Sequence, residues 1–352
     1  MPAATYAPGR RLLMSASLVC GLTLLSISGA IAGRGDKVGA ASATQLSIPV
    51  GGRSISLAGS ILSTVGGAEA IFWNPAGLVR TGRSTELMFS HMSYLAGIGV
   101  EYAAVGKRIG GGASVGISLK ALSVGEIPVT TELFPDGTGE TTSPTFLVLG
   151  AAFSRKMSDQ IAVGVSANVI HESMAEVSAT GIAFTGGVQY ARLGGVDGLS
   201  VGVVIRNIGP KLVYDGDGLE RTGIINGSGR GESNYKVEAA SADLPSTIEV
   251  GLGYLYRLND PIVIAFSSQF QNNNFSDDEY KFGAEFTYDE RLFLRAGYDY
   301  STEAEGNESL YGPAFGLGVV QTLQNVLIQV DYAYRTVRHF SGNHVITITL
   351  GF

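Results

Sequence analysis

The side chains that most often bind metal ions are few in this sequence and are scattered along it. Four histidines fall in separate segments, without the spacing of a metal-binding motif: His91, His171, His339 and His344. Two acidic clusters lack the regular spacing of a calcium-binding loop: Asp215/Asp217/Glu220 and Asp277/Asp278/Glu279. Solvated surface charge is the simpler interpretation of both clusters. We therefore expect no metal site.

One stretch formally matches a hydrolase motif. Gly112-Ala113-Ser114-Val115-Gly116 has the G-x-S-x-G pattern of a nucleophile elbow, which requires a turn between a strand and a helix. Here the pattern lies within an alternating, strand-like run, so a structural role is favoured. No G-x-G-x-x-G or P-loop pattern is present. We expect no catalytic residue, no cofactor and no enzymatic activity.

The composition excludes several classes of protein. Glycine accounts for 49 of 352 residues, about twice the usual share, and charged residues are scarce. The net charge is −7, and no run of Lys or Arg is present, so nucleic acid is not an expected partner. After the first thirty or so residues, no apolar run approaches the ~18 residues of a membrane helix. A Gly-rich, apolar chain without long apolar runs favours β-structure.

Residues 1–32 have the features of a secretory signal peptide. Arg10 and Arg11 provide the positive start, Leu12–Ser28 the apolar stretch, and Ala30-Ile31-Ala32 the cleavage site. The single cysteine, Cys20, lies within this segment, so no disulfide framework is expected in the mature chain. We expect Sec-dependent export.

From Thr85 onward the sequence consists of short runs in which apolar and polar residues alternate, as in strands. Counting these runs gives about fourteen, an even number as in single-chain bacterial barrels. Their expected spans are 85–92, 98–107, 112–122, 145–155, 160–171, 179–190, 199–208, 246–257, 262–271, 279–288, 291–300, 312–321, 326–334 and 344–352. Each is long enough for a tilted strand to cross a bilayer.

Long and short connections alternate along these runs. The long ones are 123–144, 209–245, 301–311 and 335–343, and an outer-membrane barrel alternates long external loops with short periplasmic turns in this way. Residues 85–352 are therefore predicted to form an all-β transmembrane antiparallel barrel in the outer membrane of a Gram-negative-type bacterium, with both termini periplasmic. The terminal Phe352 is an expected signal for the barrel assembly machinery. Two soluble β-domains are the alternative.

The two faces of the predicted strands differ. One is apolar and carries aromatic residues near strand ends, as in Tyr298/Tyr300 and Tyr332/Tyr334, which is typical of a face toward outer-membrane lipid. The other carries charges, which are costly in lipid and are expected to face the lumen. The predicted luminal residues are Glu101, Lys120, Arg206, Glu249, Lys281, Glu285, Arg295, Asp299 and Asp331.

Residues 44–84 do not alternate, and we predict that residues 33–84 form a hatch inside the barrel. Glycines on the luminal face would leave room for such a segment: Gly99, Gly116, Gly164, Gly202, Gly251, Gly283, Gly297 and Gly316. The expected hatch residues are Trp73, Asn74, Pro75 and Gly77, with Asn74 bonding exposed backbone groups and Pro75 setting a bend. A periplasmic tail is the alternative.

This segment carries a family resemblance. Gly51-Gly52-Arg53, Ala58-Gly59-Ser60 and Ala70-Ile71-Phe72-Trp73-Asn74-Pro75-Ala76-Gly77-Leu78 resemble the opening of PorV/PorQ-like outer-membrane proteins, relatives of the FadL-type fatty-acid transporters. Further matching stretches include Gly125–Thr131, Leu294–Tyr298 and Asp331–Tyr334, so the resemblance extends over nearly the whole mature chain. It implies a 14-stranded FadL-like barrel with an N-terminal hatch.

Two functions agree with this resemblance. A PorV-type protein would engage exported protein cargo or secretion-system subunits at the cell surface, in type IX secretion, through loops 123–144 and 209–245. A FadL-like conduit would carry a hydrophobic small molecule through the lumen, with the hatch as its gate. The first predicts apolar surface on the loops, and the second predicts an apolar pocket near residues 48–80.

Overall fold

The computed structural model describes residues 39–223, 231–301 and 309–352. The expected signal peptide, residues 1–32, lies outside these ranges. Within the described ranges, no helix has the length and apolar character needed to cross a membrane.

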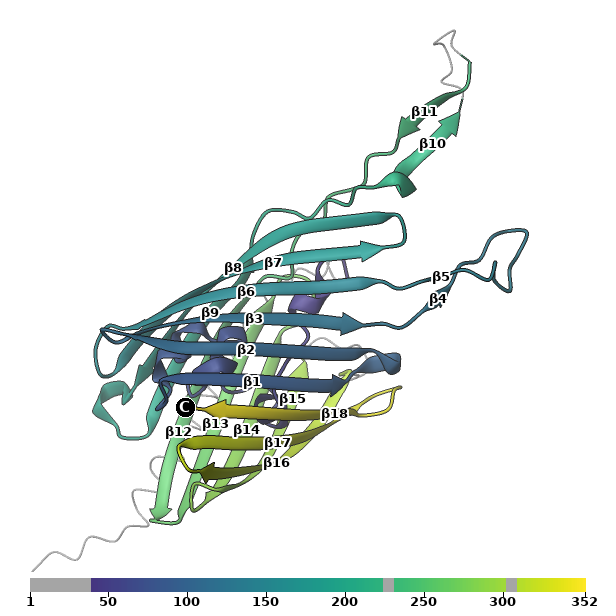
Figure 1. Ribbon diagram of the computed structural model, residues 1–352. Helices are drawn as coiled ribbons and strands as arrows, with labels where there is room; N and C mark the ends of the chain where they lie inside the picture. Colours follow the sequence, from purple (N-terminus) through teal and green to yellow (C-terminus); the bar gives the residue numbers. More distant parts are fainter. Residues whose placement is uncertain (1–38, 224–230, 302–308) are drawn as a thin grey trace, which may run out of the picture.

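Fourteen strands form one closed antiparallel barrel, as the sequence predicts (Figure 1). Neighbours in the chain are neighbours in the sheet, and β1 pairs with β18 to close it, with Phe89 opposite Ile348. The strands are β1 (Thr85–Ser93), β2 (Gly99–Gly110), β3 (Ala113–Ser123), β6 (Thr145–Lys156), β7 (Ile161–Met174), β8 (Val177–Ala191), β9 (Leu199–Ile208), β12 (Thr247–Asn259), β13 (Ile262–Asn273), β14 (Glu279–Tyr288), β15 (Leu292–Ser301), β16 (Tyr311–Leu323), β17 (Val326–Val337) and β18 (Asn343–Gly351).

Strand β3 shows why these runs form a barrel wall. Ser114 and Lys120, on one face, are buried toward the lumen, whereas Ile117 and Leu119, on the other, are exposed. Successive side chains of a strand point to opposite faces, so alternation in the sequence becomes two chemically different surfaces. Ser114 of the hydrolase-like motif therefore lies on a strand, where a nucleophile elbow cannot form.

The connections at the two ends of the barrel differ in length. One end has tight turns, and the chain end lies there, where Phe352 N donates to Thr85 O at 2.9 Å. At the other end two hairpins project well beyond the barrel (Figure 1): β4 (Ile127–Pro128) with β5 (Thr141–Thr142), and β10 (Glu220–Gly223) with β11 (Ser233–Lys236). We call this the loop end. Its connections also include short 3₁₀ turns, among them η5 (Leu95–Gly97) and η7 (Asp217–Leu219), whereas η6 (Leu193–Gly195) lies at the turn end.

Residues 39–84 lie inside the barrel, and we call this segment the hatch (Figure 1). Its short helices are η2 (Thr44–Leu46), α2 (Gly52–Ser56), η3 (Gly67–Glu69), α3 (Ala70–Trp73) and η4 (Pro75–Arg80). At the α3–η4 junction the Asn74 side chain accepts from Ala76 N at 3.1 Å, and Pro75 occupies the first position of η4. Proline suits this position because its fixed φ fits a helix and its missing N–H has no helical partner there.

Glycines let the hatch backbone touch the barrel wall. A Cβ at Gly164 would collide with the backbone of Pro75 and Ala76, and one at Gly202 with the backbone at Leu62. Seven of the eight predicted luminal glycines meet the hatch or neighbouring luminal side chains in this way. Gly99 does not, because a Cβ there would lie near the outward side chains of His91 and Glu101. The prediction that Gly99 faces the lumen is therefore wrong.

The apolar core lies between hatch and wall. One cluster joins Leu78 and Ile71 of the hatch to Met88, Tyr102 and Ala104 of β1 and β2. A second joins hatch and wall near the loop end: Ile48, Ile55, Met92, Val100, Ala333 and Val345. These contacts bury apolar surface inside the barrel, so the hatch is packed as part of the fold.

Candidate functional site

A cavity of about 650 Å³ lies between the hatch and the loop end of the barrel, and we call it the chamber. Its inner side is lined by hatch residues 44–49, by Ile55, Ala58 and Gly59, and by Phe72 and Trp73. Trp73 is buried, and its Nε1 donates to Val50 O at 3.0 Å. The pocket expected near residues 48–80 is therefore present, with a volume in the range of small-molecule sites.

The two sides of the chamber differ in chemistry. One side, from the β1–β2 connection to β7, is mostly apolar: Tyr94, Ile98, Leu122, Ile127, Phe146 and Met174. The opposite side, on β12 to β17, is polar: Thr247, Glu249, Gln271, Asn273, Glu279, Lys281, Asp299 and Arg335. A ligand in this chamber would meet an apolar surface on one side and hydrogen-bonding groups on the other.

Most charges of the polar side are already neutralised by neighbours. Arg206 Nε lies 3.0 Å from Glu249 Oε1, and Lys281 Nζ lies 2.7 Å from Glu279 Oε2. The Arg335 guanidinium stacks 3.7 Å from the centre of the Tyr311 ring. Because buried charges are costly unless they are paired, these contacts hold the polar side in place without a ligand.

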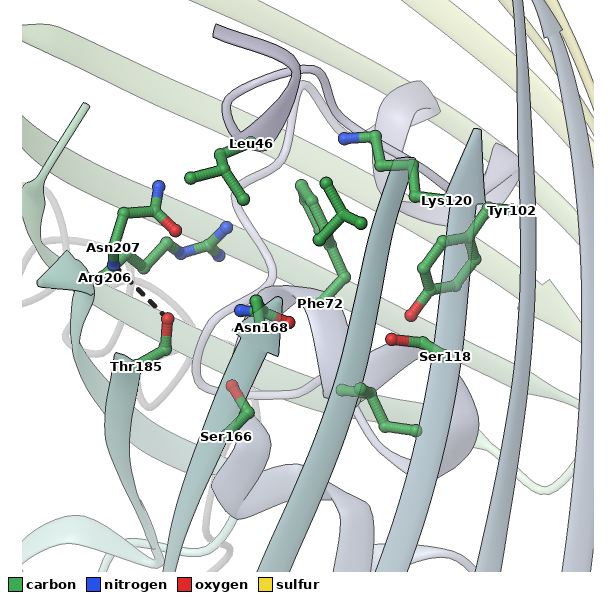
Figure 2. Close-up of a pocket in the computed structure, with 12 residues that line it drawn as sticks. Leu46, Phe72, Tyr102, Ser118, Lys120, Ser166, Asn168, Thr185, Arg206 and Asn207 are labelled. Carbon is green, nitrogen blue, oxygen red and sulfur yellow. Dashed lines mark hydrogen bonds between the residues drawn. The ribbon is translucent and has the colours of Figure 1, made fainter. Parts of the chain in front are cut away.

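A smaller cavity, which we call the inner pocket (Figure 2), lies next to the chamber. Both cavities are lined by Phe72, Leu46, Arg206 and Asn207. The Lys120 ammonium lies 4.7 Å and the Arg206 guanidinium 5.2 Å from the centre of the Phe72 ring. Cations over an aromatic face are attracted to it, so Phe72 is held at the boundary between the two cavities.

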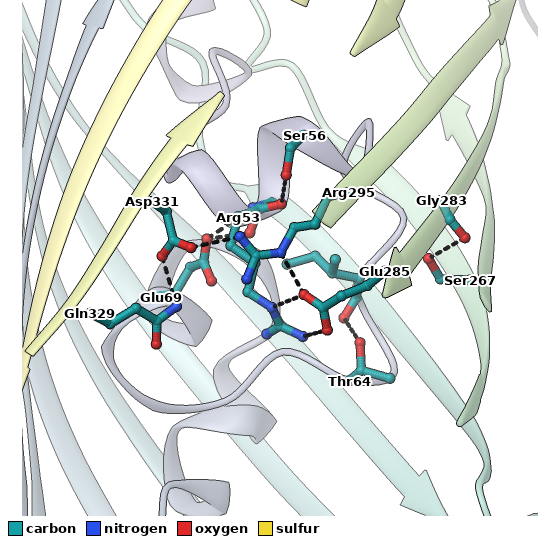
Figure 3. A network of polar contacts seen from close by, with 12 residues as sticks. Arg53, Ser56, Thr64, Glu69, Ser267, Gly283, Glu285, Arg295, Gln329 and Asp331 are labelled. Carbon is teal, nitrogen blue, oxygen red and sulfur yellow. Dashed lines mark hydrogen bonds and ion pairs between the residues drawn. The ribbon is translucent and has the colours of Figure 1, made fainter. Parts of the chain in front are cut away.

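An ionic network joins the hatch to the wall on the other side of the barrel (Figure 3). Arg53 of α2 donates to both carboxylate oxygens of Glu285 on β14, at 3.1 and 3.4 Å. Arg295 on β15 pairs with the same carboxylate at 2.5 Å and with Asp331 on β17 at 2.6 Å. The Arg295 side chain is fully buried. One hatch helix is thereby tied to three strands.

Glu69 adds a contact within the hatch. Its carboxylate accepts from the backbone N–H of Ser54 at 3.3 Å and from the Ser54 hydroxyl. Burial raises the pKa of the Glu69 carboxyl, and the charge of Arg53 opposes that rise. Arg53 and Glu69 are the only charged residues between positions 45 and 79, which is a signal that sequence analysis could have used to assign them to this network.

The expected hatch residues occupy one junction. Asn74 Nδ2 donates to Leu62 O at 2.8 Å and to Val188 O at 3.2 Å, so its amide bonds both hatch and wall backbone. Pro75 contacts the wall at Gly164. A Cβ at Gly77 would collide with the carbonyl of Val65. The junction is therefore too tightly packed for a larger residue at either glycine.

The predicted luminal residues divide into groups. Lys120, Arg206, Glu249, Lys281 and Asp299 lie around the two cavities. Glu285, Arg295 and Asp331 lie together in the ionic network. The sequence predicted only that all of these residues face the lumen. The structure divides them into two groups, one around the cavities and one in the ionic network.

Glu101 is a correction, because it does not face the lumen. Its side chain is 55% exposed on the outer face, where its carboxylate lies 2.5 Å from His91 Nδ1. The residues of β2 that face inward are Val100, Tyr102 and Ala104, which pack in the two apolar clusters at the hatch. An apolar hatch makes this part of the lumen apolar, so the rule that charges point inward fails here.

Sequence analysis missed other side chains around the cavities. The motif around Phe72 does not indicate a cavity, and the inner-pocket residues Ser118, Ser166 and Thr185 do not stand out in the sequence. These three occupy inward positions on β3, β7 and β8, in phase with Gly116, Gly164 and Gly187 on the same strands. Small polar residues that alternate in phase with luminal glycines are the sequence pattern that indicates these inward positions.

Solved structures share this architecture, although no protein-family model and no curated protein sequence matches the chain. The CymD monoaromatic hydrocarbon channel aligns with a TM-score of 0.57 and 16% identity, over 86% of this chain and 98% of that one. The Pseudomonas putida toluene transporter TodX gives 0.54 and 14%, over 86% and 97%. A FadL homologue of Pseudomonas aeruginosa gives 0.50 and 11%, over 87% and 98%.

The chain shares the fold of these proteins. The expected barrel of fourteen strands with an N-terminal segment inside is confirmed. Membership of the narrower PorV/PorQ group stays a prediction, since these neighbours include hydrocarbon channels and no protein named for cargo handling.

Proposed function

We propose that this protein is an outer-membrane conduit for small hydrophobic molecules, which enter the chamber from the loop end. The observation that carries the proposal is the chamber itself, with an apolar side and an inner side made by the hatch. Neighbours of the same fold are a monoaromatic hydrocarbon channel and a toluene transporter. This is the FadL-like function that the sequence left as its alternative.

Trp73 provides the test of ligand binding. It is the only tryptophan and lines the chamber, so its fluorescence reports on the chamber alone. We expect toluene, added to the purified protein in detergent, to change this fluorescence saturably. Phe146→Asp should raise the toluene concentration that gives half of the fluorescence change at least about tenfold, because a buried carboxylate opposes an apolar ligand. A linear, unsaturable response, unaffected by this substitution, would reject the proposal.

Loop residues give a matched control and test the second function. Leu133 and Phe134, in the β4–β5 hairpin, are 86% and 59% exposed, and this apolar surface favours a protein partner as the second candidate. Leu133→Asp should leave toluene binding unchanged. If Leu133→Asp instead abolishes surface display of exported proteins in the host while Phe146→Asp does not, the cargo function is supported in place of the conduit.

The orientation of the barrel is a separate prediction. We propose that the loop end faces the outside and that the C-terminus is periplasmic, since long loops are external in such barrels. The expectation of a periplasmic N-terminus does not fit the hatch, which begins at the loop end, where Gly39 N donates to Phe275 O at 3.2 Å. A cysteine at Gly231, where a Cβ meets open space in the β10–β11 region, should react with a membrane-impermeant maleimide on intact cells. A cysteine at Asp159, in the exposed β6–β7 turn, should react only after lysis. The reverse pattern would invert the barrel.

A further inference from the structure

One carboxylate of the chamber has no partner among the described residues. Asp299 lies on β15 and lines the chamber. Its Oδ1 is buried and accepts no hydrogen bond from a described residue, and none of the ion pairs found between described residues includes Asp299. The other carboxylates of the lining, Glu249 and Glu279, are each paired with a cation. Because buried polar groups are almost always hydrogen-bonded, the Asp299 carboxylate is available to a donor on a ligand.

Arg335 on β17 is the matching cation. It lines the chamber, and its Nε and Nη2 both donate to the neutral side chain of Asn343, at 3.2 and 2.9 Å. Within the described part of the chain, no ion pair includes Arg335. Asp299 and Arg335 are therefore the two unpaired charges of the lining, and they have opposite signs. The formal charges around the chamber sum to zero, so an uncharged ligand keeps the balance and a charged one upsets it.

The strand register places these two groups on one side of the chamber. Only β16 lies between β15 and β17. On β16 the residue opposite Arg335 is Ala314, which is also opposite Gly297 on β15. Asp299 lies two positions from Gly297 toward the loop end, on the same face of the strand. Neither Ala314 nor Gly297 has a polar side chain, so this part of the wall offers the carboxylate no donor.

The hatch supplies an apolar surface beside Asp299. A Cβ at Gly297 would collide with the backbone of Leu57 and Ala58, so this part of the hatch lies directly against β15. The chamber-lining hatch residues from α2, from the turn after it and from α3 that are closest in character to a hydrocarbon are Ile55, Ala58, Gly59 and Trp73. A ligand whose polar group reaches Asp299 can therefore rest its apolar part on the hatch.

We propose that the chamber selects molecules that carry a neutral hydroxyl group on a small apolar body, as alcohols and phenols do. The hydroxyl donates to the Asp299 carboxylate, and the apolar body packs on the hatch. This inference rests on the proposed conduit function and names the class of molecule within it. A hydrocarbon would leave the carboxylate without a donor, and a cation would add a net charge to a lining that is already balanced.

Benzyl alcohol and ethylbenzene form the decisive pair of probes, because they differ only by a hydroxyl in place of a methyl group. Each is titrated into the purified protein in detergent, with Trp73 fluorescence as the readout. The Kd of ethylbenzene divided by that of benzyl alcohol should fall at least about tenfold in Asp299→Leu, since only the alcohol loses a hydrogen bond to a charged group. Partitioning of the probes into detergent is the same for both proteins and cancels from this comparison.

Two further variants control for folding and for loss of charge. Asp299→Asn keeps an acceptor oxygen without the charge and should lower the ratio severalfold, so it decides if Asp299→Leu does not fold. Asp197→Leu is the matched control, because this carboxylate is 86% exposed and pairs with Arg192 at the turn end. It should leave the ratio unchanged.

Two other ligands test the position and the charge of the bound group. Crystals grown with 4-bromobenzyl alcohol should show an anomalous bromine peak in the chamber, with the hydroxyl within hydrogen-bonding distance of Asp299. Benzylamine, the cationic match, should bind more weakly than benzyl alcohol. Tighter binding of benzylamine would overturn the neutral class.

The outcomes separate this inference from the conduit function. Saturable binding of ethylbenzene, with a ratio that neither Asp299 variant lowers, overturns the inference and leaves the conduit intact. If neither ethylbenzene nor benzyl alcohol binds saturably, the conduit function is rejected and the inference is rejected with it.

Discussion

Removing residues 45–80 is expected to convert a closed barrel into an open pore. A barrel of fourteen strands encloses a lumen wider than side chains alone can fill, as they do in a barrel of eight. In this protein the hatch fills that space, from the clusters around Leu78 and Ile55 to the contacts at Gly164 and Gly202. In planar bilayers the parent should conduct little, and the deletion variant should show porin-like conductance.

A point substitution tests the same idea without removing the hatch core. A Cβ at Gly297 would collide with the backbone of Leu57 and Ala58, so Gly297→Val should displace the hatch and raise conductance. Gly186→Val is its control, because a Cβ at Gly186 meets nothing within 4 Å. A folded deletion variant that conducts as little as the parent would show that the hatch does not close the lumen.

Replacing Arg295 by methionine is expected to destabilise the barrel strongly. The substitution leaves Asp331 with only the amide of Gln329 at 2.7 Å, and Glu285 with only Arg53. Removing one partner of a buried ion pair costs about 3–5 kcal/mol, because a buried charge is left uncompensated. The free energy of unfolding in urea, followed by Trp73 fluorescence, should fall by that amount.

A second arginine on the same hairpin gives the control. Arg291 is 69% exposed in the β14–β15 turn and pairs with the exposed Asp289 at 3.5 Å. Surface ion pairs contribute little to stability, so Arg291→Met should unfold at nearly the same urea concentration as the parent. If Arg295→Met is as stable as Arg291→Met, the buried network does not hold the hatch and the wall together.

The strands and their order could be predicted from the sequence alone. Alternation depends on the fixed period of a strand, which places neighbouring side chains on opposite faces wherever the strand lies. The runs around Ile117 and Ile348 therefore indicated strands without any knowledge of their partners. The unequal connections separated the loop end from the turn end, and the non-alternating residues before Thr85 indicated a hatch.

The site could not be predicted in the same way, because it depends on which strands face which part of the hatch. Arg53 and Asp331 are 278 positions apart in the chain, yet both belong to one network through Glu285 and Arg295. No pattern within a short stretch of sequence indicates a contact between residues so far apart in the chain. Only the closed barrel, with α2 docked against it, brings these charges together.

Glu101 shows the limit of the sequence argument most clearly. Alternation determined that Glu101 and Tyr102 lie on opposite faces of the wall, as the structure confirms. Which face points inward was decided by the hatch, whose apolar side chains take up Tyr102 and leave the carboxylate outside with His91. The pattern of one strand determines two surfaces, and the chemistry of what packs inside the barrel decides which of them becomes the lumen.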